Sequence, residues 1–266
     1  MRFLRIFPIV LSVVLAACGE EKPPQKPVST PVDTARCGSL RGVVRLEGTP
    51  PKRRVVSMGD ATCKRESEAV IGAEVLEERC VATPDPSGTG HTLKDAFVWI
   101  SKGLEGRTFA WPDTPVVIDQ KGCMFTPHVV GAMTWQEVNL RNSDPVAHNV
   151  SYAKATANRP FNVTLGSAGA SETKRFGKPE SAMRFACDVH PWMDAYVHVV
   201  PHPHFAVTTA DGRFEIGRAG GTPSLPEGDY VVSVWTQAFG TKEIPVKVVA
   251  GATTDVVVPA FTTPKD

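Results

Sequence analysis

Four side chains of the types that bind transition metals lie in two short stretches of the sequence. Cys187, His190 and Met193 follow one another at three-residue intervals in RFACDVHPWMDAYVHVV, and His148 lies upstream in LRNSDPVAHNV. Two imidazoles and a thiolate form a trigonal donor set that suits copper, and a thioether supplies a weak axial contact. Cu(I) favours sulfur ligands and Cu(II) favours nitrogen ligands. A rigid site that offers sulfur and nitrogen donors together therefore changes its geometry little when an electron is transferred. The spacing predicts one mononuclear copper ion.

Other metals fit these donors less well. Structural zinc sites usually contain two or more cysteines, and a thioether is a poor zinc ligand. A binuclear copper centre would require a second cysteine in the loop, and only Cys187 is there. A single cysteine or methionine at a strand end is usually a packing residue. It is therefore the combination of four donors that indicates a metal site.

The remaining histidines give weaker signals. His128, in CMFTPHVVG, is a candidate for an additional residue near the metal. His198, His202 and His204, in VHVVPHPHF, could form a secondary metal site, but we expect them on an exposed linker between domains. The sequence has no phosphate loop, nucleophile elbow or paired carboxylates in a supporting context. We therefore expect an electron carrier and no enzyme.

Most of the chain is predicted to form short β-strands that position these donors. The segments are rich in Val, Ile, Phe and Tyr and are bounded by turn residues. They lie at 40–48, 94–102, 114–120, 135–142, 183–187, 195–200, 205–209, 212–216, 229–236, 244–249 and 254–259. Only 60–78 has the composition of a short helix. The expected fold class is all-β, built of sandwiches or barrels.

The first residues resemble a secretion signal. Two arginines precede an apolar run that is too short to span a membrane, and LAAC follows it at residues 15–18. This stretch resembles the bacterial lipoprotein box, which implies a signal peptide at 1–17 and lipidation of Cys18. The same resemblance implies an outer-membrane location, because Gly19, and not Asp, follows the cysteine. The Pro-rich stretch 18–36 is expected to be an extended tether.

Export would favour disulfides. Besides Cys18 there are five cysteines, and the odd count leaves one thiol over. Cys187 is the natural free thiol, because it lies in the metal motif. The other four allow three pairings that the sequence does not separate. We favour Cys63 with Cys123 and Cys37 with Cys80.

The run from VVIDQKGCMF through DPVAHNV to FACDVHPWM resembles the cupredoxins, in particular the short-loop, amicyanin-like form. The resemblance implies a Greek-key β-sandwich and a type 1 (blue) copper site. It also implies that Asn149 ties the His148 loop to the Cys187 loop by hydrogen bonds, and that the Ala147 carbonyl approaches the copper opposite Met193. Pro191 and Trp192 would stiffen and screen the loop. The edge of His190 would reach solvent.

The C-terminal part resembles a carboxypeptidase regulatory-like, or transthyretin-like, β-sandwich. It carries an Asp-Gly hairpin signal at 211–212 and a PEGDY turn at 226–230. The first strands of such a sandwich are found upstream, in GVVRLEG and KDAFVWI. We therefore expect one sandwich formed by 37–110 plus 201–262, with a cupredoxin domain inserted at 111–200. A tandem arrangement is the alternative.

The charge balance also bears on partners. Lys and Arg number 29, while Asp and Glu number 28, so no overall field would attract nucleic acid. We expect a lipid-anchored, periplasm-facing electron carrier that meets a redox protein such as a cytochrome or a copper enzyme. It would touch the membrane only through its lipid. The alternatives are a protein that stores or delivers copper, and an adhesive or carbohydrate-binding lipoprotein whose site is vestigial.

Overall fold

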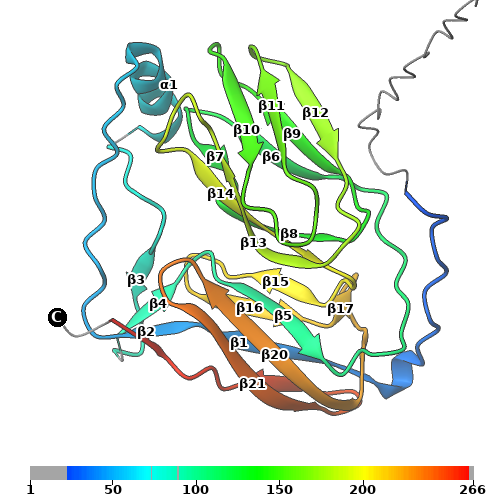
Figure 1. Ribbon diagram of the computed structural model, residues 1–266. Helices are drawn as coiled ribbons and strands as arrows, with labels where there is room; N and C mark the ends of the chain where they lie inside the picture. The colour runs from blue at the N-terminus through cyan, green and yellow to red at the C-terminus, as the bar shows by residue number, and fades with distance from the viewer. Residues whose placement is uncertain (1–22, 73, 89, 264–266) are drawn as a thin grey trace, which may run out of the picture.

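The computed structural model describes residues 23–72, 74–88 and 90–263 (Figure 1). The expected signal peptide and Cys18 lie outside these residues. The chain is almost entirely β-structure, with one α-helix, α1 (Ala61–Ile71), and one 3-10 turn, η1 (Thr34–Arg36), among the described residues. The all-β fold class is confirmed. No helix in the described part of the chain has the length and apolar character needed to cross a membrane.

Residues 116–200 form a two-sheet sandwich, here called the central sandwich, in the upper part of Figure 1. Its strands are β6 (Val116–Gln120), β7 (Phe125–Thr126), β8 (Val129–Met133), β9 (Val138–Asn142), β10 (His148–Tyr152), β11 (Phe161–Leu165), β12 (Ser171–Lys174), β13 (Glu180–Ala186) and β14 (Asp194–Val200). One sheet has the order β11-β10-β13-β14-β8, and the other has the order β12-β9-β6-β7. The pairs β14–β8 and β6–β9 are parallel.

The alternation of residue types along β13 explains how this sandwich forms. Met183 and Phe185 are buried, whereas Arg184 between them is exposed. Because successive side chains of a strand point to opposite faces, this pattern directs one face of β13 into the core. β13 pairs antiparallel with β14, and residues 187–193 form the turn between them. That turn carries the predicted ligands.

The remaining strands form a second layered unit, here called the outer sandwich, in the lower part of Figure 1. They are β1 (Cys37–Val43), β2 (Arg45–Glu47), β3 (Ala82–Pro84), β4 (His91–Leu93), β5 (Phe97–Lys102), β15 (Phe205–Val207), β16 (Arg213–Ile216), β17 (Arg218–Ala219), β18 (Thr222–Pro223), β19 (Leu225–Pro226), β20 (Gly228–Thr236), β21 (Gly240–Val248), β22 (Thr253–Val256) and β23 (Phe261–Thr262). β1 pairs with β16 and β22, and β5 lies between β15 and β20. Strands from before residue 110 therefore pair with strands from after residue 200.

An aromatic cluster joins the two sandwiches. The ring of His198, on β14, stacks on Phe97 at 4.1 Å and meets the edge of Trp235 at 4.6 Å between centroids. His198, His202 and His204 are all buried. The expectation of an exposed linker is therefore wrong, because the outer sandwich packs against β14 and the residues that follow it.

One connecting segment departs from expectation, and a second runs from one sandwich to the other. Within the predicted tether, Lys26 pairs with Asp113 and the Thr30 amide donates to the Thr108 carbonyl. This part of the chain thus lies along residues 108–113 instead of extending freely. Residues 48–72 and 74–81, here called the flap, leave the outer sandwich after β2, carry α1 to the upper end of the central sandwich and return to β3 (Figure 1).

The cysteines are paired only in part as expected. Cys63 in α1 and Cys123 in the turn after β6 form a disulfide. Cys37 and Cys80 are both free and buried, so the second favoured pairing is wrong. The reason is topological. Cys37 begins β1 and faces Pro226 across that sheet, whereas Cys80 precedes β3 in a different sheet.

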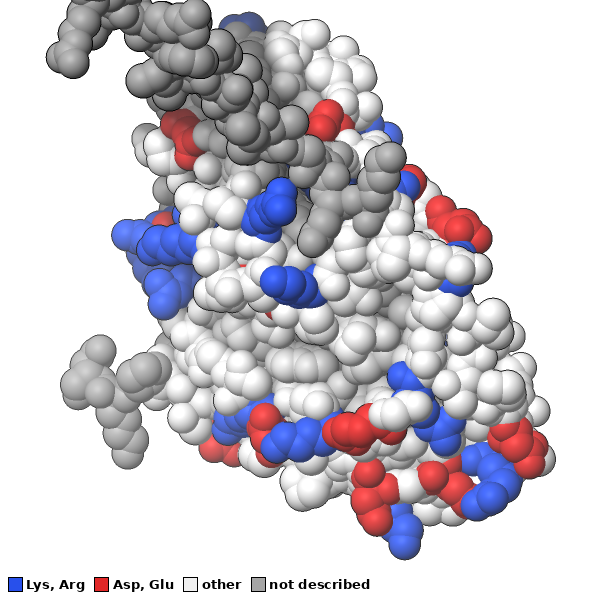
Figure 2. All heavy atoms as spheres, turned by 45° about the vertical axis from the view of Figure 1, so that its right-hand side comes forward, with Lys and Arg blue, Asp and Glu red and all other residues white. Residues whose placement is uncertain are grey.

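The surface carries charges of both signs. In Figure 2, acidic and basic side chains alternate along the lower edge, over the outer sandwich. Ion pairs in this unit include Arg41 with Asp255 and Arg218 with Glu215. The lower edge of the face shown therefore has no extended region of a single sign, in keeping with a formal net charge of +1.

Candidate metal centre

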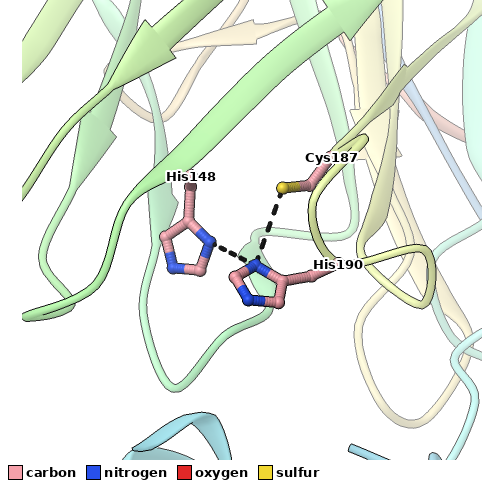
Figure 3. A group of neighbouring side chains, drawn as sticks. All are labelled: His148, Cys187 and His190. Carbon is pink, nitrogen blue, oxygen red and sulfur yellow. Dashed lines mark hydrogen bonds between the residues drawn. The ribbon is translucent and has the colours of Figure 1, made fainter. Parts of the chain in front are cut away.

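Three donor atoms converge at the upper end of the central sandwich. His148 is the first residue of β10, Cys187 directly follows β13, and His190 lies in the turn after it. The two histidine Nδ1 atoms are 2.9 Å apart, and Cys187 Sγ lies 3.7 Å from His190 Nδ1 (Figure 3). A ligand atom of each residue lies within 4.8 Å of the others. The three side chains are 0%, 4% and 2% exposed for His148, His190 and Cys187, so they face one another away from water.

Backbone hydrogen bonds close the ligand loop. The Cys187 amide donates to the Met193 carbonyl at 3.1 Å, and the Met193 amide donates to the His190 carbonyl at 2.9 Å. Met193 is fully buried in the same apolar core as Cys187. Pro191 in this turn has no amide hydrogen that would compete for these acceptors. The loop is therefore held compact by the protein itself, and the axial role of Met193 stays a prediction.

A buried carboxylate that the sequence analysis missed orients His148. Asp144 Oδ2 lies 2.9 Å from His148 Nε2, and the same carboxylate accepts the amides of Gly122 and Cys123 at 2.6 and 2.8 Å. Because a carboxylate only accepts, it fixes a hydrogen on Nε2 and leaves the Nδ1 lone pair facing His190 and Cys187. The signal was an aspartate four residues before the histidine, in SDPVAHN.

Asn149 links the two ligand loops. Its Oδ1 accepts the Asp188 amide at 2.7 Å and lies 3.3 Å from Cys187 Sγ. Its Nδ2 donates to Asp188 Oδ2 and to Asn162 Oδ1, each at 2.8 Å. These bonds fix the position of the sulfur relative to the strand that carries His148.

The surroundings of the donors also favour ionisation of the thiol. Burial by itself would raise the pKa of Cys187, but hydrogen bonds from His148 and from nearby backbone groups outweigh it and lower this pKa. Burial opposes the charged form of His148 as well, yet hydrogen bonds to Asp144 and Cys187 raise its pKa to about 9. Burial and the neighbouring His148 lower the pKa of His190. A thiolate is the form that binds metals, and His148 must lose one proton when a metal binds.

The flap covers the outer edge of His190. Cys63 Sγ lies 3.5 Å from His190 Nε2, and Trp192 Nε1 donates to the Cys123 carbonyl at 3.0 Å. The expectation that the edge of His190 reaches solvent is therefore wrong. Cys63 and His190 are far apart in the sequence, and no local sequence pattern predicts a contact between them.

The other predicted site residues lie as follows. His128 is not part of the donor group, because its ring nitrogens contact the Asp194 carbonyl at 3.1 Å and Gln237 Oε1 at 2.7 Å. Ala147 and Pro191 are exposed and Trp192 is half-buried. The approach of the Ala147 carbonyl to a metal stays a prediction. Within the described residues, His198, His202 and His204 belong to no group of clustered metal-binding side chains.

No family model and no curated protein matches this chain. Among solved structures, a region of it is similar to a Cu-containing nitrite reductase from Thermus scotoductus SA-01, with 21% identity over 37% of this chain and 24% of that chain and a TM-score of 0.31. It is also similar to a Cu(I) form of a mutant amicyanin, with 17% identity over 33% of this chain and 84% of that chain and a TM-score of 0.30. The chain thus spans about a quarter of the reductase it matches. Because these likenesses are distant and partial, the donor atoms themselves decide which chemistry the centre supports.

Proposed function

We propose that this protein binds one copper ion as a mononuclear type 1 centre and carries single electrons between redox partners, such as a cytochrome or a copper enzyme. The observation that carries the proposal is the convergence of two Nδ1 atoms and one cysteine sulfur in a buried pocket, with the tautomer of His148 set by Asp144. The ligands would be His148, Cys187 and His190, with Met193 as a weak axial ligand.

The donor set fits copper better than zinc. It has one thiolate and two imidazoles, whereas structural zinc sites usually take two or more cysteines in a tetrahedral arrangement. Copper bound here would supply one-electron redox chemistry. The hydrogen bonds of Asp144 and Asn149 and the closed loop hold the donors in place without metal, so little rearrangement would accompany a change of oxidation state.

A second candidate function is copper storage or delivery without electron-transfer turnover. The covered edge of His190 favours it, because that edge is the expected contact for electron exchange. The two functions differ in the rate of electron exchange and in how readily the copper is released. A carrier exchanges electrons fast and holds its copper tightly, whereas a delivery protein passes Cu(I) to an acceptor.

We further propose that the protein is lipid-anchored and faces the periplasm from the outer membrane. The support is the LAAC motif followed by Gly19. The Cys63–Cys123 disulfide suits an oxidising compartment. Fractionation of cells into inner and outer membranes, with a Cys18→Ala variant as the control, tests this location. Recovery of the wild type in the cytosol would contradict it.

The decisive experiment is an absorption and electron paramagnetic resonance spectrum of the chain from residue 19 onward, loaded with Cu(II). We expect an intense visible thiolate-to-copper band that Cys187→Ser abolishes and the matched Cys80→Ser variant retains. A colourless loaded wild type would reject a type 1 centre. If the band is present, the rate of electron self-exchange and the transfer of Cu(I) to a chelator separate the carrier from the delivery protein.

A further inference from the structure

The flap is weakly attached to the surface that it covers. Among the described residues of the flap only Cys63, Ser67, Val75 and Cys80 are buried, and Met58 is a partly buried side chain that packs against the core of the central sandwich. The helix α1 buries the first two, which are small, while Val70 and Ile71 at its end are 46% and 45% exposed. Since apolar burial supplies most of the attraction between packed elements, the side chains of α1 give it little hold on the central sandwich.

The two legs of the flap bond to each other. The Val56 amide donates to the Val75 carbonyl at 2.8 Å, and the Glu77 amide donates to the Arg54 carbonyl at 3.0 Å. Arg53 also donates to the Glu77 carbonyl. These bonds stay intact if the tip lifts away, so the flap can move as one body at little cost in hydrogen bonds.

The tip is held at the metal centre by a covalent bond. Cys63 joins Cys123, whose backbone is bonded to both ligand loops: Asp144 accepts its amide, and Trp192 donates to its carbonyl. On the other side, Cys63 Sγ covers His190 Nε2 at 3.5 Å. The disulfide is thus both the fastening of the flap and the group that seals the outer edge of His190.

We propose that the flap is a releasable cover over the His190 side of the donor group, locked shut by the Cys63–Cys123 disulfide and opened by a dithiol reductant, and that it controls access of metal ions to the donors. In the opening step the dithiol gives two electrons and two protons. Its sulfurs join in a disulfide, the Cys63–Cys123 bond breaks, and two thiols form. Both cysteine residues are buried, so the flap must first open locally before a reductant reaches them. Because the flap buries few apolar side chains, such local opening costs little free energy.

The inference rests on the proposed function only in treating His148, Cys187 and His190 as metal ligands. Accessibility of His190 is measurable without any metal, so the cover and the copper centre can fail separately. The test uses diethyl pyrocarbonate, which modifies exposed imidazoles, on the metal-free chain from residue 19 onward. Peptide mass spectrometry then gives the rate at each histidine.

Four samples are compared: the oxidised wild type, the wild type reduced with dithiothreitol and then freed of it without air, the Cys63→Ser/Cys123→Ser variant, and a Cys37→Ser/Cys80→Ser variant that keeps the disulfide. We expect His190 to react at least about tenfold faster in the second and third samples than in the first and fourth, as for a locally opened segment. His202 and His204, buried beside the outer sandwich, should keep their rates. Uptake of Cu(II) chloride should accelerate in the same two samples.

The other outcomes overturn the proposal. If His190 stays protected after reduction and in the double serine variant, the disulfide does not lock a cover. If every buried histidine reacts faster together, the disulfide braces the whole fold and no separate cover exists. If His190 opens and the protein binds copper, but the rate of Cu(II) uptake does not change, the flap does not control metal access. A wild type that shows the labelling pattern but never binds copper would refute the copper function alone.

Discussion

Replacement of Asp144 by asparagine isolates the group that sets the tautomer of His148. The carboxylate accepts a hydrogen bond from the N–H at Nε2 of His148, so Nδ1 carries no hydrogen and is free to bind a metal. The amide still offers an oxygen, but the amides of Gly122 and Cys123 compete for it. If the amide nitrogen turns toward Nε2 instead, it donates there and forces the hydrogen onto Nδ1, where it blocks ligation.

The size of the effect follows from the kind of interaction that the substitution removes. Removing the partner of a metal-binding histidine typically lowers metal affinity 10- to 100-fold, which is about 1.4–2.8 kcal/mol. The buried carboxylate also accepts two backbone amides, and charge-assisted bonds contribute about 1.5–3 kcal/mol each to stability. We therefore expect Asp144→Asn to weaken copper binding about 10- to 100-fold and to lower the unfolding free energy of the metal-free protein.

The assay is a competition titration against a chelator of known copper affinity, read from the visible absorption band. Asp119→Asn is the matched control, because Asp119 is a nearly buried aspartate that pairs with Arg141 and accepts from Ser143. The control should keep wild-type affinity. If Asp144→Asn binds copper within about twofold of the wild type while remaining folded, orientation of His148 by Asp144 is refuted, since 10-fold is the least that such a partner supplies.

Three further predictions concern stability. Burial opposes the charge of Glu180, but hydrogen bonds from Thr156, Tyr152 and Asn158 lower its pKa to about 2. The contribution of Glu180 to the unfolding free energy is therefore full above pH 4.5 and is lost as the pH falls toward 2. Glu180→Gln should lower the unfolding free energy, measured by urea denaturation at pH 7, by about 2 kcal/mol. Burial lowers the pKa of His198 to about 3, so below pH 6.5 only the unfolded chain gains its proton. The unfolding free energy should then be about 2 kcal/mol lower at pH 5 than at neutral pH. An equal drop between these pH values in His198→Phe would show that His198 is not its cause. A Cβ at Gly131 would lie 2.5 Å from the Phe205 ring and 2.6 Å from the Phe97 ring; Gly131→Ala should lower the unfolding free energy by about 1–3 kcal/mol, and an unchanged thermal melt would show that the interface between the sandwiches yields.

Much of the fold and of the donor loop could be predicted from sequence, because both depend on local patterns. Alternation of apolar and polar residues identifies strands such as β13, since the period of a strand is two residues. The spacing of Cys187, His190 and Met193 places three donors in one turn between paired strands. The link from Asn149 to that turn was implied by the resemblance to the cupredoxins, and the local pattern of residues alone does not predict it.

The sequence by itself determined which residues carry metal-binding atoms and that β-strands hold them. Only the tertiary structure decided what surrounds those atoms. It brought Asp144 to His148, set Cys63 against His190, left Cys37 and Cys80 unpaired and buried His198 between two sandwiches. The physical reason is that strand formation depends on neighbours along the chain, whereas these contacts depend on how separate sheets and a long flap pack together, which local patterns do not record.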